Sequence, residues 1–225
     1  MTRLDPAQLE ELVARVHAHS GGFSTCGRHA VLGLYKSVAL VVFLLRENPT
    51  QQLAGAVFGS SQATVPRRFT LPHQVIGDVL ADLLPDPVAA AGGSTVLIDG
   101  TLARTWDWKA RGDLYSGKHR DTGFNLQVAT TLAGDLLAVS APIPGSHHDA
   151  HAFTASGLAA DLTSVGLLGN LGYLGTDTLT GTRTPPKAEL SGDRKQANTD
   201  LSALRAAVER TISWLKNWKS IGGRC

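Results

Sequence analysis

The run Val96-Leu97-Ile98-Asp99-Gly100-Thr101 decides the fold. Three apolar residues precede an acidic residue, and a Gly-Thr pair follows at once. A short apolar run of this kind predicts a buried strand, which would deliver the Asp99 carboxylate to the edge of a sheet. A simpler interpretation stays open, in which Asp99 only caps the exit from strand to turn. The choice depends on whether other segments bring carboxylates to the same place.

The composition indicates a globular protein with room for one large domain or two small ones. The chain has 225 residues, of which 43% are hydrophobic and 18% charged, and a net charge of +2. This charge neither requires nor excludes a nucleic-acid partner. Cys26 and Cys225 fit no metal-ligand spacing and suit a reducing cytosol. The apolar run 30–45 is short for a membrane span and contains Lys36, so we expect a core helix and no membrane contact.

The first part of the chain has helical periodicity. Residues 5–19 predict a helix with Asp5 as its N-cap, and further helices are expected at 28–46 and 71–84. A stretch rich in proline, alanine and glycine at 85–93 then marks the domain boundary. We therefore expect an all-α domain at 1–88 and a second domain at 94–225.

Residues 50–69 predict two short helices on either side of Gly59. A helix, a glycine turn and a polar, basic second helix are typical of a helix-turn-helix that binds DNA. The side chains expected to face DNA are those of Gln62, Thr64, Arg67 and Arg68. Pro66 would delay or kink the second helix. An ordinary helical hairpin with a solvated basic end remains the alternative.

After the boundary the hydrophobic period becomes that of strands. Three strands are expected at 95–99, 124–131 and 135–141, followed by a helix, a strand at 165–168 and a long helix at 199–219. A basic loop is expected at 182–195. The predicted fold class is α/β, a mixed sheet with flanking helices in the ribonuclease H-like order, although periodicity alone allows other α/β folds.

The last helix would place Arg205, Glu209 and Lys216 in one sector of its surface. Glu209 lies between apolar positions, so its carboxylate needs a cation. That cation could be Arg205 in a plain intrahelical ion pair. It could instead be a divalent metal ion shared with Asp99, and two hard carboxylates suit Mg²⁺.

The run His147-His148-Asp149-Ala150-His151 has spacing that would put His147 and His151 on one helix face. No glutamate or cysteine completes a zinc site, so a helix start capped by Ser146 or Asp149 is preferred. Asp149 also follows a predicted strand and is a candidate metal ligand. The loop that contains Lys118 lies near Trp106 and Trp108, a combination that can hold nucleic acid.

Five motifs occur in a fixed order. They are Asp99-Gly-Thr, Tyr115-Ser-Gly-Lys-His, Pro144-Gly-Ser-x-His-Asp149, Asn170-Leu-Gly-Tyr-x-Gly and Arg205-x3-Glu209-x6-Lys216. Together they resemble the DDE-type transposases of bacterial insertion sequences, close to the Harbinger-like DDE superfamily endonucleases. The resemblance implies a ribonuclease H-like domain that hydrolyses and joins double-stranded DNA at element ends with Mg²⁺ or Mn²⁺. It is compatible with a homodimer and with a cytoplasmic, nucleoid-associated protein.

The resemblance also implies roles for single residues. Asp99, Asn170 and Glu209 match the catalytic positions, Asp99, Asp149 and Glu209 would hold metal, and Lys118, Arg205 and Lys216 would face DNA. Asn170 stands where the family has its second carboxylate, so weaker metal binding and impaired or lost cleavage are expected. The chain ends at Cys225, soon after Trp218-Lys219, which suggests a shortened copy. The alternatives are a non-catalytic DNA-binding relic or repressor and a structure-specific nuclease.

Overall fold

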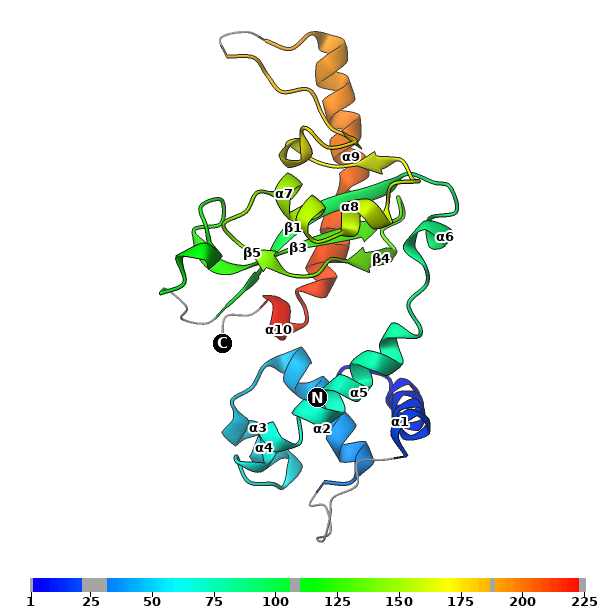
Figure 1. Ribbon diagram of the computed structural model, residues 1–225, viewed down its shortest axis with the longest axis vertical. Helices are drawn as coiled ribbons and strands as arrows, with labels where there is room; N and C mark the ends of the chain where they lie inside the picture. Colours follow the sequence, from blue (N-terminus) through cyan, green and yellow to red (C-terminus); the bar gives the residue numbers. More distant parts are fainter. Residues whose placement is uncertain (1, 22–31, 106–109, 187–188, 223–225) are drawn as a thin grey trace. The chain divides into compact units, whose positions relative to one another are not determined.

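The structure is a computed structural model that describes residues 2–21, 32–105, 110–186 and 189–222. The chain divides into two compact units (Figure 1). A helical unit contains the residues up to Leu84 together with 217–222, and a sheet unit contains Pro85–Lys216. Each unit is described by itself.

The helical unit is built around α2, Leu34–Glu47. Seven consecutive residues of this helix, Ser37 to Phe43, are buried because the sequence is apolar nearly all round. One side of α2 packs against the other long helices of the unit, and the opposite side packs against the short ones. The remaining helices are α1 (Pro6–Ser20), α3 (Gln51–Phe58), α4 (Thr64–Arg67), α5 (Thr70–Ala81) and α10 (Lys219–Gly222).

Both ends of α1 follow from the sequence. The Asp5 side chain accepts a hydrogen bond from the Ala7 backbone, and the Gln8 side chain accepts one from the Asp5 backbone. The helix ends at Gly21, whose φ of 64° is left-handed. The predicted Asp5 cap is therefore confirmed.

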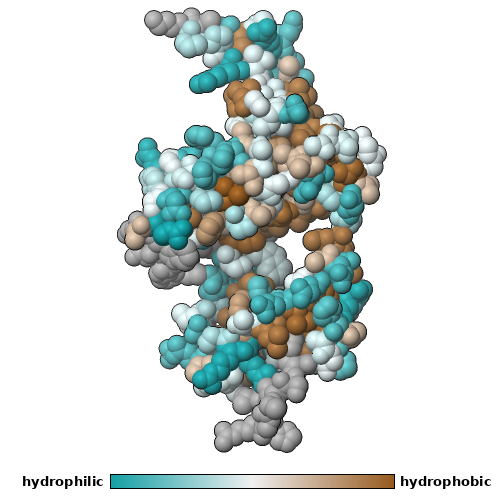
Figure 2. Space-filling model, viewed as in Figure 1, coloured by the Kyte–Doolittle hydropathy of each residue, from teal (hydrophilic) through white to brown (hydrophobic). Residues whose placement is uncertain are grey.

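The second helix expected between Gly59 and residue 69 is shorter than predicted. Only α4, with four residues, forms there, and α5 begins at Thr70. Pro66 is the third residue of α4 and has no backbone N–H to donate to the preceding turn, so α4 does not extend back toward Ser61. Pro72 lies in the first turn of α5, where a missing backbone donor is tolerated. Hydrophobic surface is visible on this unit (Figure 2). The exposed hydrophobic residues of the unit include Leu71, Leu80 and Leu83.

The sheet unit contains a mixed sheet with central strands β1 (Val96–Arg104) and β3 (Asp121–Thr130). Strand β3 pairs antiparallel with β1 on one side and with β4 on the other. Strand β6 runs parallel to β1, and β7 runs parallel to β6. This is the mixed sheet that the sequence predicts. The shorter strands are β2 (Tyr115–Ser116), β4 (Leu136–Val139), β5 (Ile143–Pro144), β6 (Leu167–Leu168) and β7 (Thr178–Leu179).

Helices cover both faces of this sheet (Figure 1). Helices α7 (Asp149–Ala155) and α8 (Leu158–Asp161) cover one face, where Phe153 and Leu162 pack against Val96 and Ile98. The long helix α9 (Gly192–Leu215) covers the other face, where Val208 and Ile212 pack against Leu97. The predicted flanking helices are thus confirmed.

Several boundaries differ from the expected ones. Helix α9 begins at Gly192, inside the segment predicted as a basic loop, and β7 was not predicted. A short helix, α6 (Pro87–Ala91), forms in the predicted linker. Trp106 and Trp108 lie outside the described residues. Among the helices that the structure describes, none is long and apolar enough to cross a membrane.

Candidate functional site

The alternation of β1 determines where its polar residues point. Leu97 packs beneath α9 and Ile98 packs beneath α7, so Asp99 lies on the α9 face and Gly100 on the α7 face. Asp99 is only 8% exposed. The apolar run therefore forms a central strand that carries a buried carboxylate.

Asp99 accepts hydrogen bonds from three other residues. Nη2 of Arg205, on α9, lies 3.0 Å from Oδ2, while Nδ2 of Asn170 and the backbone N of Gly100 lie 2.8 and 2.9 Å from Oδ1. Burial raises the pKa of Asp99 above its ordinary value, and the charge of Arg205 opposes this rise. Such a buried carboxylate is stabilised by its hydrogen-bond donors.

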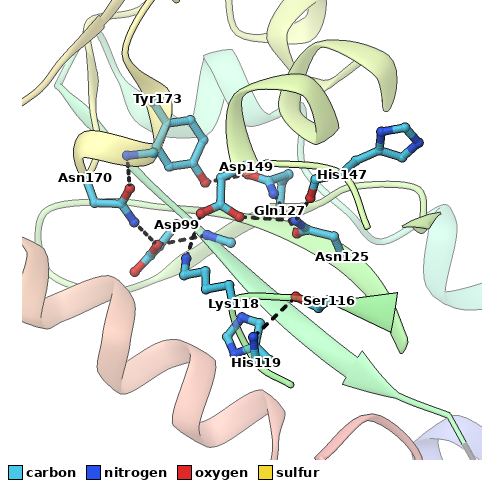
Figure 3. Close-up of polar contacts among 12 residues, drawn as sticks. Asp99, Ser116, Lys118, His119, Asn125, Gln127, His147, Asp149, Asn170 and Tyr173 are labelled. Carbon is cyan, nitrogen blue, oxygen red and sulfur yellow. Dashed lines mark hydrogen bonds and ion pairs between the residues drawn. The ribbon is translucent and has the colours of Figure 1, made fainter. Parts of the chain in front are cut away.

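Asn170 follows β6 and precedes the short helix η2 (Leu171–Tyr173). Its amide oxygen accepts a hydrogen bond from the Gly172 backbone at 2.6 Å, and its amide nitrogen donates to Asp99. Figure 3 shows the Asn170 side chain directed at Asp99. The structure thus brings together residues from β1, the end of β6 and α9.

Asp149 is a second buried carboxylate at the same place, at 7% exposure. It accepts hydrogen bonds from Nζ of Lys118 at 2.8 Å and from Nδ2 of Asn125 at 3.1 Å. The expectation that Ser146 or Asp149 caps a helix is wrong, because α7 has no side-chain cap. The Asp149 side chain is instead held by buried Asn125 on β3 and by the exposed Lys118.

Gly100 allows Asp149 to come close to β1. A Cβ atom at Gly100 would lie 2.9 Å from Cγ of Asp149 and 3.0 Å from Nε2 of Gln127. Real Cβ atoms almost never come this close to other atoms. The Gly of the Asp99-Gly-Thr motif is therefore required by packing.

A chain of buried polar side chains, two of them on β3, supports the Asp149 carboxylate, and it was not predicted from the sequence. Nε2 of Gln127 donates to Oδ1 of Asn125 at 2.8 Å, and the hydroxyl of Tyr173 donates to the Gln127 side chain (Figure 3). Burial and then the charge of Asp149 raise the pKa of Tyr173. The available signal was the two-residue spacing of Asn125 and Gln127, which puts both on one face of β3.

A cavity of about 840 Å³ lies beside these groups. Its lining is rich in cations and imidazoles, with one carboxylate among them. The lining includes Lys118, His119, Asn125, His147, His148, Asp149, Asn170 and Arg205. Burial and the charge of Lys118 lower the pKa of His119, which favours its neutral form. The rings of His147 and His151 stack with centroids 4.3 Å apart.

Glu209 lies one turn of α9 away from Arg205. Its side chain is 60% exposed, and Oε1 lies 3.7 Å from Nη2 of Arg205. It is not among the residues that line the cavity.

Burial and the charge of Arg104 lower the pKa of Lys216, and the charge of Asp99 opposes this change. Within the described ranges, no group of three His, Cys, Asp or Glu residues could hold a metal ion.

The four residues predicted to face DNA lie in the helical unit. Gln62 and Arg67 are exposed, whereas Thr64 and Arg68 are half-buried. The turn before them is tight, because a Cβ atom at Gly55 of α3 would lie 2.8 Å from the Ser60 carbonyl oxygen. The structure thus places these four side chains on and around α4.

Comparisons with known proteins agree on one family. The sequence model of the DDE superfamily endonucleases matches residues 98–225. The chain is 26% identical over 221 residues to a candidate transposase of insertion sequence element IS112 from Streptomyces albus G, covering 96% of this chain and 82% of that protein. No solved structure matches. The chain therefore belongs to the DDE superfamily endonucleases, among the DDE-type transposases of insertion sequences.

Proposed function

We propose that the chain binds double-stranded DNA at the ends of an insertion element and hydrolyses and joins it there. One observation carries this proposal: Asp99, Asn170 and Arg205 meet from β1, the end of β6 and α9. Each of these residues belongs to a different one of the five motifs that carry the family resemblance, and the three motifs follow one another in the same order along the chain. The ribonuclease H-like assignment of the sheet and a homodimer at the DNA belong to the same proposal.

DDE superfamily endonucleases generally use divalent metals, and the carboxylates of this chain fit Mg²⁺ or Mn²⁺. Asp99 and Asp149 supply buried oxygen ligands on adjoining elements, and exposed Glu209 can supply another from α9. A divalent metal held by these carboxylates would supply activation of a water or a 3′-hydroxyl and stabilisation of the leaving oxygen. Glu209 would have to turn from solvent toward Asp99 to take part.

The chain's own cations have a separate task in this proposal. Lys118 and Arg205 line the cavity beside the carboxylates, and Lys216 follows on the same helix as Arg205. Positively charged side chains hold the DNA backbone by neutralising phosphates, which makes binding sensitive to salt. Neutral His119 beside Lys118 can accept a proton during the reaction.

We assign DNA recognition in the helical unit to α3 and α4 as a helix-turn-helix. Gly59, with a φ of 67°, forms the turn, and the close packing over Gly55 suits such a motif. Gln62, Thr64, Arg67 and Arg68 would contact DNA. Because α4 has only four residues, α5 would have to support the orientation of these side chains.

A second candidate function is DNA binding without cleavage, as a relic or a repressor. The direct hydrogen bond from Asn170 to Asp99 favours it, because the family has a carboxylate at this position. Both candidates predict salt-sensitive DNA binding, and only the first predicts cleavage that depends on metal.

Nicking of an oligonucleotide that carries the element end, measured with Mn²⁺, tests the assignment. Asp99→Ala should abolish nicking, whereas Asp161→Ala, at an exposed carboxylate of α8, should leave it intact. Unchanged nicking by the Asp99 variant would refute the site. If the wild-type chain binds DNA but does not nick it, a gain of nicking by Asn170→Asp identifies an impaired enzyme. No gain identifies a DNA-binding protein.

A further inference from the structure

The amide of Asn170 is a hydrogen-bond donor to Asp99, which differs from the role of a metal ligand. We infer that Asn170 and Arg205 together replace a divalent cation at Asp99 in the free chain. Metal then binds there only by displacing them. This inference rests on the proposed function, because it concerns the same site.

The orientation of the Asn170 amide is fixed by its two partners. Its oxygen accepts from the Gly172 backbone N–H, and its nitrogen donates to the Asp99 carboxylate. The opposite orientation would set the NH₂ group against an N–H and the oxygen against a carboxylate, so both contacts would be repulsive. A metal ligand needs its oxygen directed at the cation, and here that oxygen is already bonded.

Arg205 supplies the positive charge that the metal would supply. The side chains of Arg205 and Asp99 are only 16% and 12% exposed. Arg205 has few other partners: Glu209 is 3.7 Å away, and the buried Nε has no hydrogen-bond partner among the described residues. A metal ion that took Asp99 would leave a buried guanidinium without its partner, and this opposes metal binding.

Asp149 is compensated in the same way by Lys118. The ammonium group lies 2.8 Å from Oδ2, and the Lys118 side chain is 59% exposed. The two buried carboxylates are therefore matched by two cations, one on α9 and one in the loop after β2. The uncharged Asn170 preserves this balance, whereas a carboxylate at position 170 would add a negative charge that attracts a divalent ion.

Mn²⁺ binding to the full chain, measured without DNA, tests the inference. The free Mn²⁺ concentration is followed by electron paramagnetic resonance, and thermal unfolding is followed by circular dichroism. The wild-type melting temperature should not change with Mn²⁺. Asn170→Asp should melt at a lower temperature without metal, recover with Mn²⁺, and bind Mn²⁺ at least tenfold more tightly than the wild type.

The double variant Asn170→Asp/Asp99→Asn is the matched control, because it has the new carboxylate but not the old one. It should lose the gain in Mn²⁺ affinity. Arg205→Met offers a second route if Asn170→Asp fails to fold, since it removes the competing cation and should also raise Mn²⁺ affinity.

Two results would overturn the inference. One is a wild-type chain whose melting temperature rises with Mn²⁺ and no longer does so after Asp99→Asn. The other is folded Asn170→Asp or Arg205→Met with wild-type Mn²⁺ affinity. Failure of the proposed function would appear elsewhere, as an absence of DNA binding and nicking.

Discussion

Replacing Gly100 with alanine adds one methyl group at the point where β1 meets Asp149. The new Cβ would lie 2.9 Å from Cγ of Asp149, and the Asp149 carboxylate is held in place by Lys118 and Asn125. The backbone at Gly100 is not left-handed, so alanine meets a lack of space there and no conformational strain. The strand or the carboxylate must therefore move.

The size of the effect follows from these contacts. Overpacking of a well-packed site costs about 1–3 kcal/mol. Displacing Asp149 from a charged hydrogen bond adds about 1 kcal/mol or more. Substitution of glycine also lowers the conformational entropy of the unfolded chain, and this stabilises the folded state by roughly 0.5 kcal/mol. We expect a net loss of about 2–3 kcal/mol, or roughly 5–10 °C in melting temperature for a protein of this size.

Scanning calorimetry of the full chain measures the decrease in the melting temperature of the sheet unit. Gly112→Ala is the matched control, because a Cβ atom there has nothing within 4 Å among the described atoms. It should keep or slightly raise the melting temperature. If Gly100→Ala proves as stable as Gly112→Ala, Asp149 does not lie against β1 and the site geometry is wrong.

Three further predictions concern other contacts. Thr211→Val should destabilise the sheet unit by about 1–2 kcal/mol, because the buried hydroxyl donates to a carbonyl in the turn before β4. Trp218→Ala should destabilise the helical unit by about 1 kcal/mol, because Arg46 lies 5.1 Å from the centre of its ring. Lys118→Met should raise the pKa of His119 toward 6.5, as measured by NMR titration, and should reduce the destabilisation that this histidine causes below pH 6.5.

Each of these predictions has a control on the same chain. Ser213→Ala, at an exposed hydroxyl of α9, should change the stability far less than Thr211→Val, and equal losses would contradict the role of the buried hydroxyl. Trp214→Ala, at a residue 64% exposed, should have little effect on the helical unit. Lys195→Met, at a lysine paired with Glu189, should leave the pKa of His119 unchanged. If both lysine variants shift this pKa equally, the effect of Lys118 does not come from its closeness to His119.

The sequence predicted the sheet because its strands bury one or both faces. The apolar run before Asp99 forms the central strand β1, and the apolar pattern of β3 and β4 places the antiparallel partners. Burial of one face of a strand requires apolar residues at regular spacing, and this spacing can be read from the sequence. The family resemblance, and not the period, indicated that Asp99 and Asn170 share a site. The contact of Arg205 with Asp99 was not predicted, because the sequence assigned Arg205 to Glu209 or to DNA.

Elements without a buried face could not be predicted in this way. The first turns of α9, from Gly192 to Asp200, are exposed apart from one half-buried residue, so no apolar stripe marks them as helical. Strand β7 has two residues and is too short to show a period. The late start of α4, by contrast, was predicted from Pro66, which cannot donate a backbone hydrogen bond to the preceding turn.

The chemistry of the site depends on a feature that residue types leave open, the direction of one amide group. From the sequence, Asn170 indicates only the loss of a charge, and a site that binds metal more weakly. In the fold the same residue gains a donor, because the Gly172 backbone takes its oxygen and turns its nitrogen toward Asp99. That contact helps to compensate the buried Asp99 carboxylate, so under the proposed function the same residue both leaves out a metal ligand and stabilises the metal-free site.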